Sequence, residues 1–212
     1  LAPTADPPLV NFNLRRLFQD ALKASGNPEA FITVYTDAEA CAIGEALARG
    51  TAEKEILAFI LVTEGVGLGV ARGTTPLGSA LHSELGMLHV RYSSSDPLRP
   101  GKEEHLYAKS LGEMASNKAM RERRAAILNK SGNSDGSLPS DQVGEIFNLR
   151  SYYLAQACLA CTVILAPHKI VIGADIDEGN FAADRANRFF REFMREREKK
   201  NQPVFDFEEL ND

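Results

Sequence analysis

Three glycines at alternate positions, Gly65, Gly67 and Gly69, lie between two apolar segments within residues 59–72. Apolar runs joined by so few residues predict two antiparallel strands in a hairpin. Glycine lets the backbone turn tightly and lets a ligand approach its N–H groups, which a phosphate cradle requires. Glu64 places a carboxylate at the same turn, and two like charges about 4 Å apart oppose each other by roughly 4 kcal/mol at an effective dielectric near 20. The hairpin therefore predicts a phosphate cradle that Glu64 opposes unless a metal ion intervenes.

The composition is that of a globular protein. The 212 residues are 44% hydrophobic and 25% charged, which fits one or two compact domains. A net charge of −5 gives no general attraction to nucleic acid or to an anionic membrane. The basic clusters 121–124 and 195–200 are interleaved with glutamates, as on solvated helix faces. No apolar run reaches the roughly 18 residues of a spanning helix, and residues 1–8 lack a signal-peptide pattern. We expect an intracellular protein that binds neither nucleic acid nor membrane.

The cysteines predict no site. Cys158 and Cys161 form a C-x-x-C within an apolar segment that we predict as a helix, where positions three apart share a face. No second Cys or His pair nearby would complete a metal site, and the odd total of three cysteines favours a reducing compartment. We interpret the pair as core packing rather than metal or redox chemistry.

The remaining pattern alternates between helical and strand-like segments and predicts an α/β fold. Residues 129–140, rich in Ser, Gly and Asn, predict a flexible surface loop. The predicted helices cover 11–24, 38–49, 107–128, 141–147, 152–166 and 181–200, and the predicted strands cover 30–35, 56–62, 66–72, 88–92 and 169–173.

Several segments, in this order, resemble motifs of the ROK family of sugar kinases, and within it the fructokinase branch. They are Asn11–Leu14, Tyr35–Glu45, Val62–Gly69, His82–Gly86, and Tyr152–Gln156 through Ile170–Gly173. The resemblance extends from about residue 9 to about residue 180. It implies the actin-like, ribonuclease H-like ATPase fold, with residues 1–50 as part of the N-terminal lobe and residues 51–212 as the C-terminal lobe.

The resemblance also implies transfer of the γ-phosphoryl group of ATP, with Mg²⁺, to a hexose hydroxyl. Asp37 matches the catalytic base, and a carboxylate suits that role because it accepts the hydroxyl proton while it positions the nucleophile. The implied substrate-binding residues are Thr36, His82, Glu84 and Glu113, and the implied nucleotide-binding residues are Gly65, Gly67, Gly69 and Gly173.

The departures from the family pattern gather at the phosphate side of this implied site. Thr63-Glu64 replaces Gly-Thr, Met87 replaces a histidine, and Ala174-Asp175 replaces two glycines. Pro100–Leu111 contains no cysteine, so we expect no structural zinc. The family's amino-terminal phosphate loop and carboxy-terminal helix have no counterpart in the sequence, which suggests truncation at both ends. Together the departures predict a catalytically degenerate homologue, or pseudokinase.

Three hypotheses follow. The first is a pseudokinase-like structural or interaction subunit, in a protein complex or homo-oligomer formed through the Phe-rich segment 181–200. The second is an active fructokinase or hexokinase seen as a fragment, which would need ATP and Mg²⁺. The third is a sugar sensor that keeps Asp37 and Glu84 as hydroxyl acceptors. The sequence contains no helix-turn-helix segment, so we expect no DNA binding.

Overall fold

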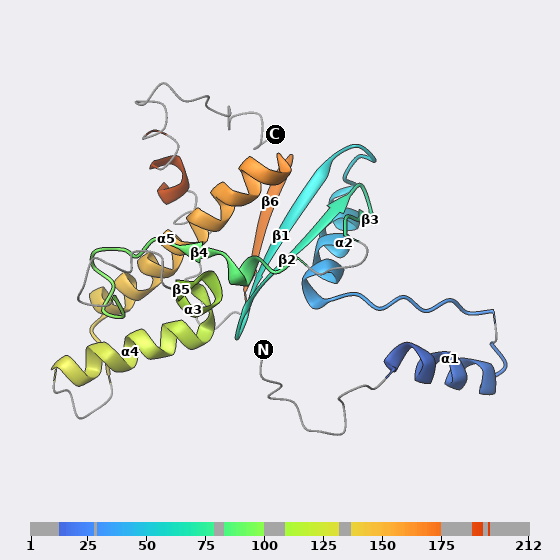
Figure 1. Cartoon of the computed structure of the whole chain (residues 1–212), viewed down its shortest axis with the longest axis horizontal. Helices are drawn as coiled ribbons and strands as arrows, with labels where there is room; N and C mark the ends of the chain where they lie inside the picture. The colour runs from blue at the N-terminus through green and yellow to red at the C-terminus, as the bar shows by residue number, and fades with distance from the viewer. Residues whose placement is uncertain are drawn as a thin grey trace. The chain divides into compact units, whose positions relative to one another are not determined.

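The computed structural model describes residues 13–27, 29–78, 83–99, 109–131, 137–174, 188–192 and 195. The chain divides into two compact units, Leu1–Thr36 and Asp37–Asp212, which are described separately (Figure 1). The predicted lobe boundary after residue 50 stays a prediction.

The first unit contains helix α1, Leu14–Ala24. It begins later than the predicted residue 11, because Asn13 is its N-cap: the Asn13 side chain accepts a hydrogen bond of 2.9 Å from the backbone N–H of Arg16. The chain then returns to the helix, where the Arg15 guanidinium lies 5.4 Å from the centre of the Phe31 ring. None of the residues of α1 is buried.

The predicted buried strand over residues 30–35 is wrong. Residues 31–36 form no regular structure, and Phe31 is 82% exposed. A strand is stabilised by ladder hydrogen bonds to a neighbour, and no described strand pairs with this segment. The β-branched pattern of this segment is therefore not sufficient by itself to predict a strand.

The second unit is built on a sheet whose described strands lie in the order β3-β2-β1-β6 (Figure 1). The predicted hairpin is confirmed, since β1 (Ile56–Val62) and β2 (Val66–Arg72) pair antiparallel around the turn 63–65. The short β3 (Thr75–Pro76) extends β2, and β6 (Lys169–Ala174) pairs parallel to β1. Because Val62 pairs with Ala174, the turn and the carboxyl end of β6 meet at one edge of the sheet.

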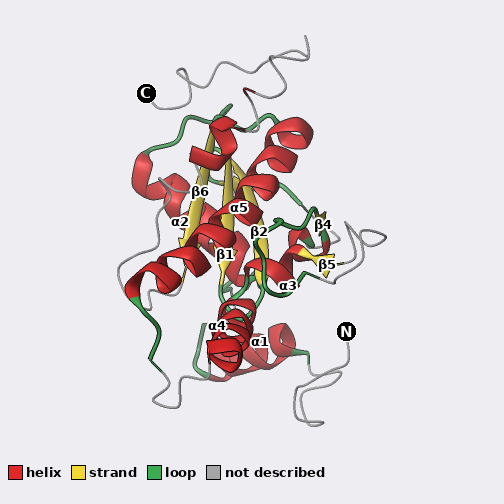
Figure 2. Cartoon of the chain, turned by 90° about the vertical axis from the view of Figure 1, so that its left-hand side faces the viewer, coloured by secondary structure: helices red, strands yellow, loops and turns green. Residues whose placement is uncertain are grey.

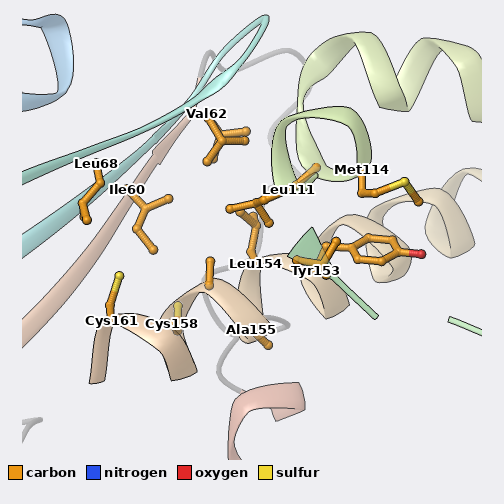
Figure 3. Close-up of a cluster of buried hydrophobic side chains, with 14 of the residues drawn as sticks. Ile60, Val62, Leu68, Leu111, Met114, Tyr153, Leu154, Ala155, Cys158 and Cys161 are labelled. Carbon is orange, nitrogen blue, oxygen red and sulfur yellow. The ribbon is translucent and has the colours of Figure 1, made fainter. Parts of the chain in front are cut away.

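Helices cover both faces of this sheet (Figures 1 and 2). The alternation along β1 sends Leu57 and Phe59 toward α2 (Asp37–Arg49), where Ala42 and Ala46 are fully buried. Ile60 and Val62 point to the other face and enter the main core with residues of α5 (Ser140–Leu165); Figure 3 shows this cluster. The buried side chains of α5 in the cluster are Leu149, Tyr153, Leu154, Ala155, Ala157, Cys158 and Cys161.

The two helices predicted over 141–147 and 152–166 form the single helix α5, since the residues between them include neither glycine nor proline. Cys158 and Cys161 lie in the core, as interpreted from the sequence. Burial raises the pKa of the Cys158 thiol to about 12 and that of Cys161 to about 11. Both thiols therefore stay protonated at neutral pH.

The single helix predicted over 107–128 is divided in two, α3 (Leu111–Ala115) and α4 (Asn117–Ser131). Ser116 interrupts it with an extended backbone (φ −69°, ψ 168°), and its hydroxyl accepts a hydrogen bond from the N–H of Ala119. The strand predicted over 88–92 is the two-residue β4 (His89–Val90), which pairs with β5 (Lys109–Ser110) outside the main sheet. A 3₁₀ turn, η2 (Leu85–Met87), precedes it.

Two predicted segments lie partly outside the described residues. Within the predicted loop 129–140, α4 extends to Ser131 and α5 begins at Ser140, while residues 132–136 lie outside the described ranges. Residues 188–192 are helical, and most of the predicted helix 181–200 lies outside the described ranges. No described helix is long and apolar enough to span a membrane.

Candidate functional site

Asp37 is the first residue of α2, and its side chain is exposed to solvent. Its Oδ1 atom accepts a hydrogen bond of 2.8 Å from the backbone N–H of Ala38. A carboxylate at this position is favoured because unpaired N–H groups and the helix dipole make the first turn electropositive. The predicted base is thus fixed at a helix terminus with its second oxygen available for a ligand hydroxyl.

Two hairpin glycines hold this helix terminus against the sheet. A Cβ at Gly69 would lie 2.0 Å from the carbonyl oxygen of Ala38, and a Cβ at Gly67 would lie 3.2 Å from the Ala38 Cβ. Gly69 therefore admits the first turn of α2 onto β2 only while it lacks a side chain, whereas at Gly67 the contact would be tight. The glycines predicted to contact nucleotide act in this structure to position Asp37.

The other two predicted nucleotide-binding glycines differ from each other. A Cβ at Gly173 would lie 2.5 Å from the ring of Phe59, so this residue also serves close packing. At Gly65, by contrast, no atom of the described structure beyond the adjacent residues lies within 4 Å of the Cβ position. Gly65 is the one of the four whose surroundings leave room for a ligand, and nucleotide contact at all four remains a prediction.

Glu64, in the hairpin turn, is held by Arg121 of α4. The Nη1 and Nη2 atoms of Arg121 donate to the two carboxylate oxygens of Glu64 over 2.8 and 2.5 Å. These hydrogen bonds hold the pKa of Glu64 below its ordinary value. The turn itself is attached to α4, because the Thr63 carbonyl accepts a hydrogen bond of 2.8 Å from the N–H of Asn117. The charge of the Glu64 carboxylate, which was expected from the sequence to oppose a phosphate, is therefore neutralised by Arg121.

A cavity of about 610 Å³ opens beside this ion pair, between the hairpin turn, α4 and the first half of α5. Three arginines and one glutamate supply its charged lining, and apolar side chains supply much of the rest. Its lining residues are Glu64, Asn117, Met120, Arg121, Arg124, Ser137, Leu138, Val143, Ile146, Phe147 and Arg150. Of these, Glu64 was expected from the sequence beside a phosphate, whereas the basic cluster 121–124 was expected on a solvated helix face.

Glu84 precedes η2 and is exposed. Its neighbourhood is fixed to β2, because Ser83 bridges to Leu68 and a Cβ at Gly86 would lie 2.5 Å from the carbonyl oxygen of Val66. Glu84 and Asp37 therefore both adjoin segment 66–69 of β2. His82 lies outside the described residues, and Thr36 belongs to the first unit.

Glu113 forms the capping box of α3. Its Oε2 atom accepts hydrogen bonds from the N–H and the hydroxyl of Ser110, over 2.9 and 3.0 Å, and Ser110 accepts one in return from the Glu113 N–H. The backbone hydrogen bond from Ser110 is the main cause of a lowered pKa at Glu113. The carboxylate is thus engaged at a helix terminus, and its predicted contact with substrate stays a prediction.

We expect Glu113→Ala to lower the free energy of unfolding by about 0.5 to 1 kcal/mol at pH 7, a typical cost for a lost cap on an exposed helix end. Because the folded pKa lies below the ordinary value of 4.5, the stabilisation is present above pH 4.5 and is lost as the pH falls through the folded value. Urea unfolding should therefore show a difference from the wild type at pH 7 that shrinks near pH 3. A pH-independent difference, or an equal loss in Glu122→Ala on the exposed side of α4, would contradict the capping assignment.

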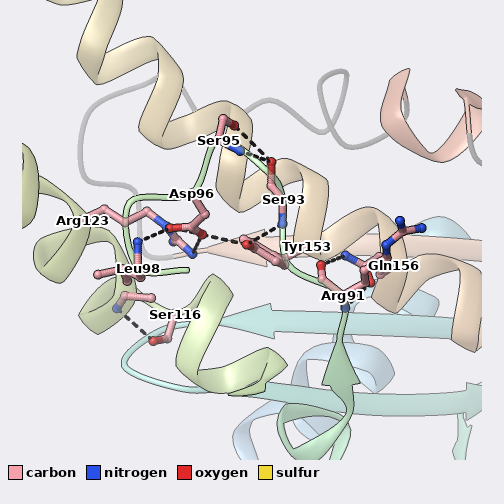
Figure 4. A network of polar contacts seen from close by, with 10 residues as sticks. Arg91, Ser93, Ser95, Asp96, Leu98, Ser116, Arg123, Tyr153 and Gln156 are labelled. Atoms are coloured by element: carbon pink, nitrogen blue, oxygen red, sulfur yellow. Dashed lines mark hydrogen bonds and ion pairs between the residues drawn. The ribbon is translucent and has the colours of Figure 1, made fainter. Parts of the chain in front are cut away.

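A buried ion pair fixes residues 91–99 to α4 and α5 (Figure 4). Arg123 donates from Nε and Nη2 to Asp96 over 3.0 and 2.8 Å, and both side chains are 0% exposed. The Tyr153 hydroxyl donates to Asp96 over 2.7 Å and accepts from the N–H of Ser93. Burial and Asp96 raise the pKa of Tyr153. This network keeps the elements that frame the cavity in one arrangement.

Arg150, on the cavity wall, joins α5 to the break between α3 and α4. Its Nε donates to the carbonyl of Ala115 over 3.0 Å, and its Nη2 donates to the Asn117 side chain over 2.8 Å. Burial and the nearby Arg123 lower the pKa of Arg150 to about 10, so its guanidinium remains charged at neutral pH.

No group of three His, Cys, Asp or Glu side chains within the described ranges is placed to hold a metal ion. Mg²⁺ that arrives with a nucleotide needs only one or two protein carboxylates, since phosphates and water complete its shell. Asp37 could supply one of these. The described residues thus fit a nucleotide-borne Mg²⁺ better than a resident ion.

The comparisons with known proteins identify the class. The ROK family profile matches residues 11–209, so this chain belongs to the ROK family. A curated relative, the fructokinase of Streptococcus mutans serotype c (strain ATCC 700610 / UA159), is 24% identical over 161 residues, which cover 75% of this chain and 51% of that protein. The chain spans about half the length of the curated relatives that it matches.

Solved structures agree on the fold. The ROK hexokinase from Thermus thermophilus superposes with a TM-score of 0.60 at 17% identity, covering 92% of this chain and 65% of that one. The ROK glucokinase from Streptomyces griseus, in complex with glucose and AMPPNP, gives a TM-score of 0.58 at 18% identity, with 82% and 61% covered. The predicted actin-like sugar kinase fold is therefore confirmed, as is the resemblance to the fructokinase branch.

Proposed function

We propose that this chain is a catalytically degenerate ROK sugar kinase homologue, retained as a binding or interaction subunit inside the cell. The observation that carries the proposal is the bidentate pair between Glu64 and Arg121 at the hairpin turn. The family resemblance implies a hydroxyl donor facing phosphate at this turn. A carboxylate only accepts hydrogen bonds, and its arginine partner already uses two donors on it.

The residues implied to bind the sugar support the proposal that sugar binding is retained. Asp37 and Glu84 are exposed carboxylates that adjoin the same segment of β2, and carboxylates readily accept hydrogen bonds from sugar hydroxyls. The S. griseus relative was solved with glucose and AMPPNP, so both ligand types are bound by this fold. A hexose is therefore the ligand that we propose for this side of the site, whereas phosphoryl transfer is lost.

An interaction role is supported by α1. Its apolar residues Leu14, Leu17 and Phe18 are exposed in the described structure, although they share one helix face. Such a face favours a protein complex or a homo-oligomer over an isolated monomer.

The test is hexose-dependent ADP formation with ATP and MgCl₂, measured for fructose, glucose and mannose. We expect no rate above the sugar-free background. Turnover that Asp37→Asn abolishes without a change in melting temperature would overturn the proposal. Asp20→Asn, a matched substitution at an exposed aspartate of α1, controls for a general effect of the lost charge.

The second candidate is an active ATP-dependent hexose kinase. Its support is that Arg121 neutralises Glu64, and that Arg124 and Arg150 give the cavity lining a net positive charge. One variant distinguishes the two candidates. In an active kinase, Arg121→Gln would lower turnover, because Glu64 would then oppose the phosphates directly.

A further inference from the structure

The cavity beside the hairpin has the charge and the size of a small-molecule site. Its volume of about 610 Å³ lies within the range of roughly 300–1,000 Å³ that is typical of ligand pockets. Three arginines stand against a single carboxylate, that of Glu64, among the described residues that line it. A lining with this balance favours an anionic ligand.

The arginines specify the kind of anion. A guanidinium binds carboxylate and phosphate oxygens in the same two-pronged geometry, and Arg121 shows that geometry with Glu64. Side chains of α5, Val143, Ile146 and Phe147, add an apolar wall beside the charged one. The wall would suit the organic part of a phosphorylated compound.

We propose that Glu64 is a built-in competing anion: it occupies Arg121 and thereby weakens the binding of phosphorylated ligands in this cavity. The competition is direct, because the two Arg121 atoms that would hold a phosphate are those that hold the Glu64 carboxylate. The pair is an autoinhibitory contact.

The contact is placed so that it can open. Glu64 and Arg121 side chains are 67% and 62% exposed, and ion pairs at such positions are held only weakly against water. The backbone of the turn is fixed by the hydrogen bond from Asn117 to Thr63, so only the Glu64 side chain has to move.

This inference shares the hairpin with the proposed function but concerns binding alone. If the titration shows no effect of Glu64, the prediction of absent turnover is unaffected. If turnover is observed, the competition between Glu64 and a phosphate for Arg121 can still be measured. The two can therefore fail separately.

The test is calorimetric titration with inorganic pyrophosphate at low salt, without divalent cations. Glu64→Gln should bind pyrophosphate at least about fivefold more tightly than the wild type, the factor that one opposing unit charge about 4 Å away corresponds to in bulk water. Glu64→Gln combined with Arg121→Gln should lose this gain. Glu53→Gln removes the same charge from an exposed position before β1, at the end of that strand away from the hairpin turn, and should bind like the wild type.

Equal affinity in the wild type and Glu64→Gln, absence of binding in both, or an equal gain in Glu53→Gln would overturn the proposal. Thermal unfolding checks that each variant is folded, and Glu64→Thr replaces Glu64→Gln if the latter is not. If the double variant Glu64→Gln with Arg121→Gln still binds pyrophosphate more tightly than the wild type, the proposal is likewise overturned.

Discussion

Gly69→Ala is expected to destabilise the second unit by about 3 kcal/mol, the upper end of the usual cost of overpacking. The added Cβ would lie 2.0 Å from the carbonyl oxygen and 2.4 Å from the carbonyl carbon of Ala38. These are backbone atoms of the first turn of α2, so no side-chain rotation can relieve the clash. Helix α2 would have to move away from β2, and Asp37 would move with it. Urea unfolding monitored by circular dichroism measures the loss.

Gly65→Ala is the matched control. It makes the same chemical change four residues earlier, in the hairpin turn, where no described atom beyond the adjacent residues lies within 4 Å of the new methyl group. We expect a change within about 0.5 kcal/mol, as for ordinary surface substitutions. Similar losses in both variants would show that the cost reflects glycine itself in the hairpin, and would contradict the packing role assigned to Gly69.

Asp96→Ala is expected to cost about 3 to 5 kcal/mol, because it leaves the buried guanidinium of Arg123 without its counter-charge. Asp96 accepts hydrogen bonds from both Arg123 and Tyr153, and the ion pair is 0% exposed on both sides. The Nη1 atom of Arg123 already has no hydrogen-bond partner within the described structure, so Asp96 supplies the counter-charge while the Tyr153 ring, 5.2 Å away, adds a cation–π contact. Equilibrium urea unfolding at pH 7 measures the loss.

The combined variant Asp96→Leu with Arg123→Met tests whether charge is the cause. Removing both partners of a buried pair and filling the space with apolar groups is often close to neutral, whereas removing one is severe. We expect the double variant to be clearly more stable than Asp96→Ala. Equal instability would mean that the network acts through packing of residues 91–99 rather than through charge compensation.

The fold was predictable where local pattern decides the structure. The alternation of β1 and β2 and the short turn between them identify the hairpin, because residues close in sequence make its hydrogen bonds. Residues 30–35 carry an equally strand-like pattern and form no strand, since pattern does not reveal whether a neighbouring strand exists. The break of the predicted helix 107–128 at Ser116 was missed because serine tolerates both a helix interior and a cap.

The site was predictable as a set of positions but not as a set of interactions. Asp37, Glu84 and the glycines were found through motif order, and the structure fixes Asp37 and Glu84 beside β2. Arg121 was not found, because it pairs with Glu64 across 57 residues of sequence and its neighbours fit a solvated helix face. The packing role of Gly69 was hidden for the same reason: only the folded chain brings Ala38 against it.

The central claim, that the hairpin turn no longer serves a nucleotide, is tested most directly by titrating the protein with ATP in the presence of a hexose, with and without MgCl₂. Enzymes typically have KM values of about 1 μM to 1 mM, so a working kinase should show saturable, Mg²⁺-dependent binding in that range. The account predicts no saturation below about 1 mM ATP and no effect of Mg²⁺. Mg²⁺-dependent binding with a micromolar Kd that Asp37→Asn weakens would contradict it.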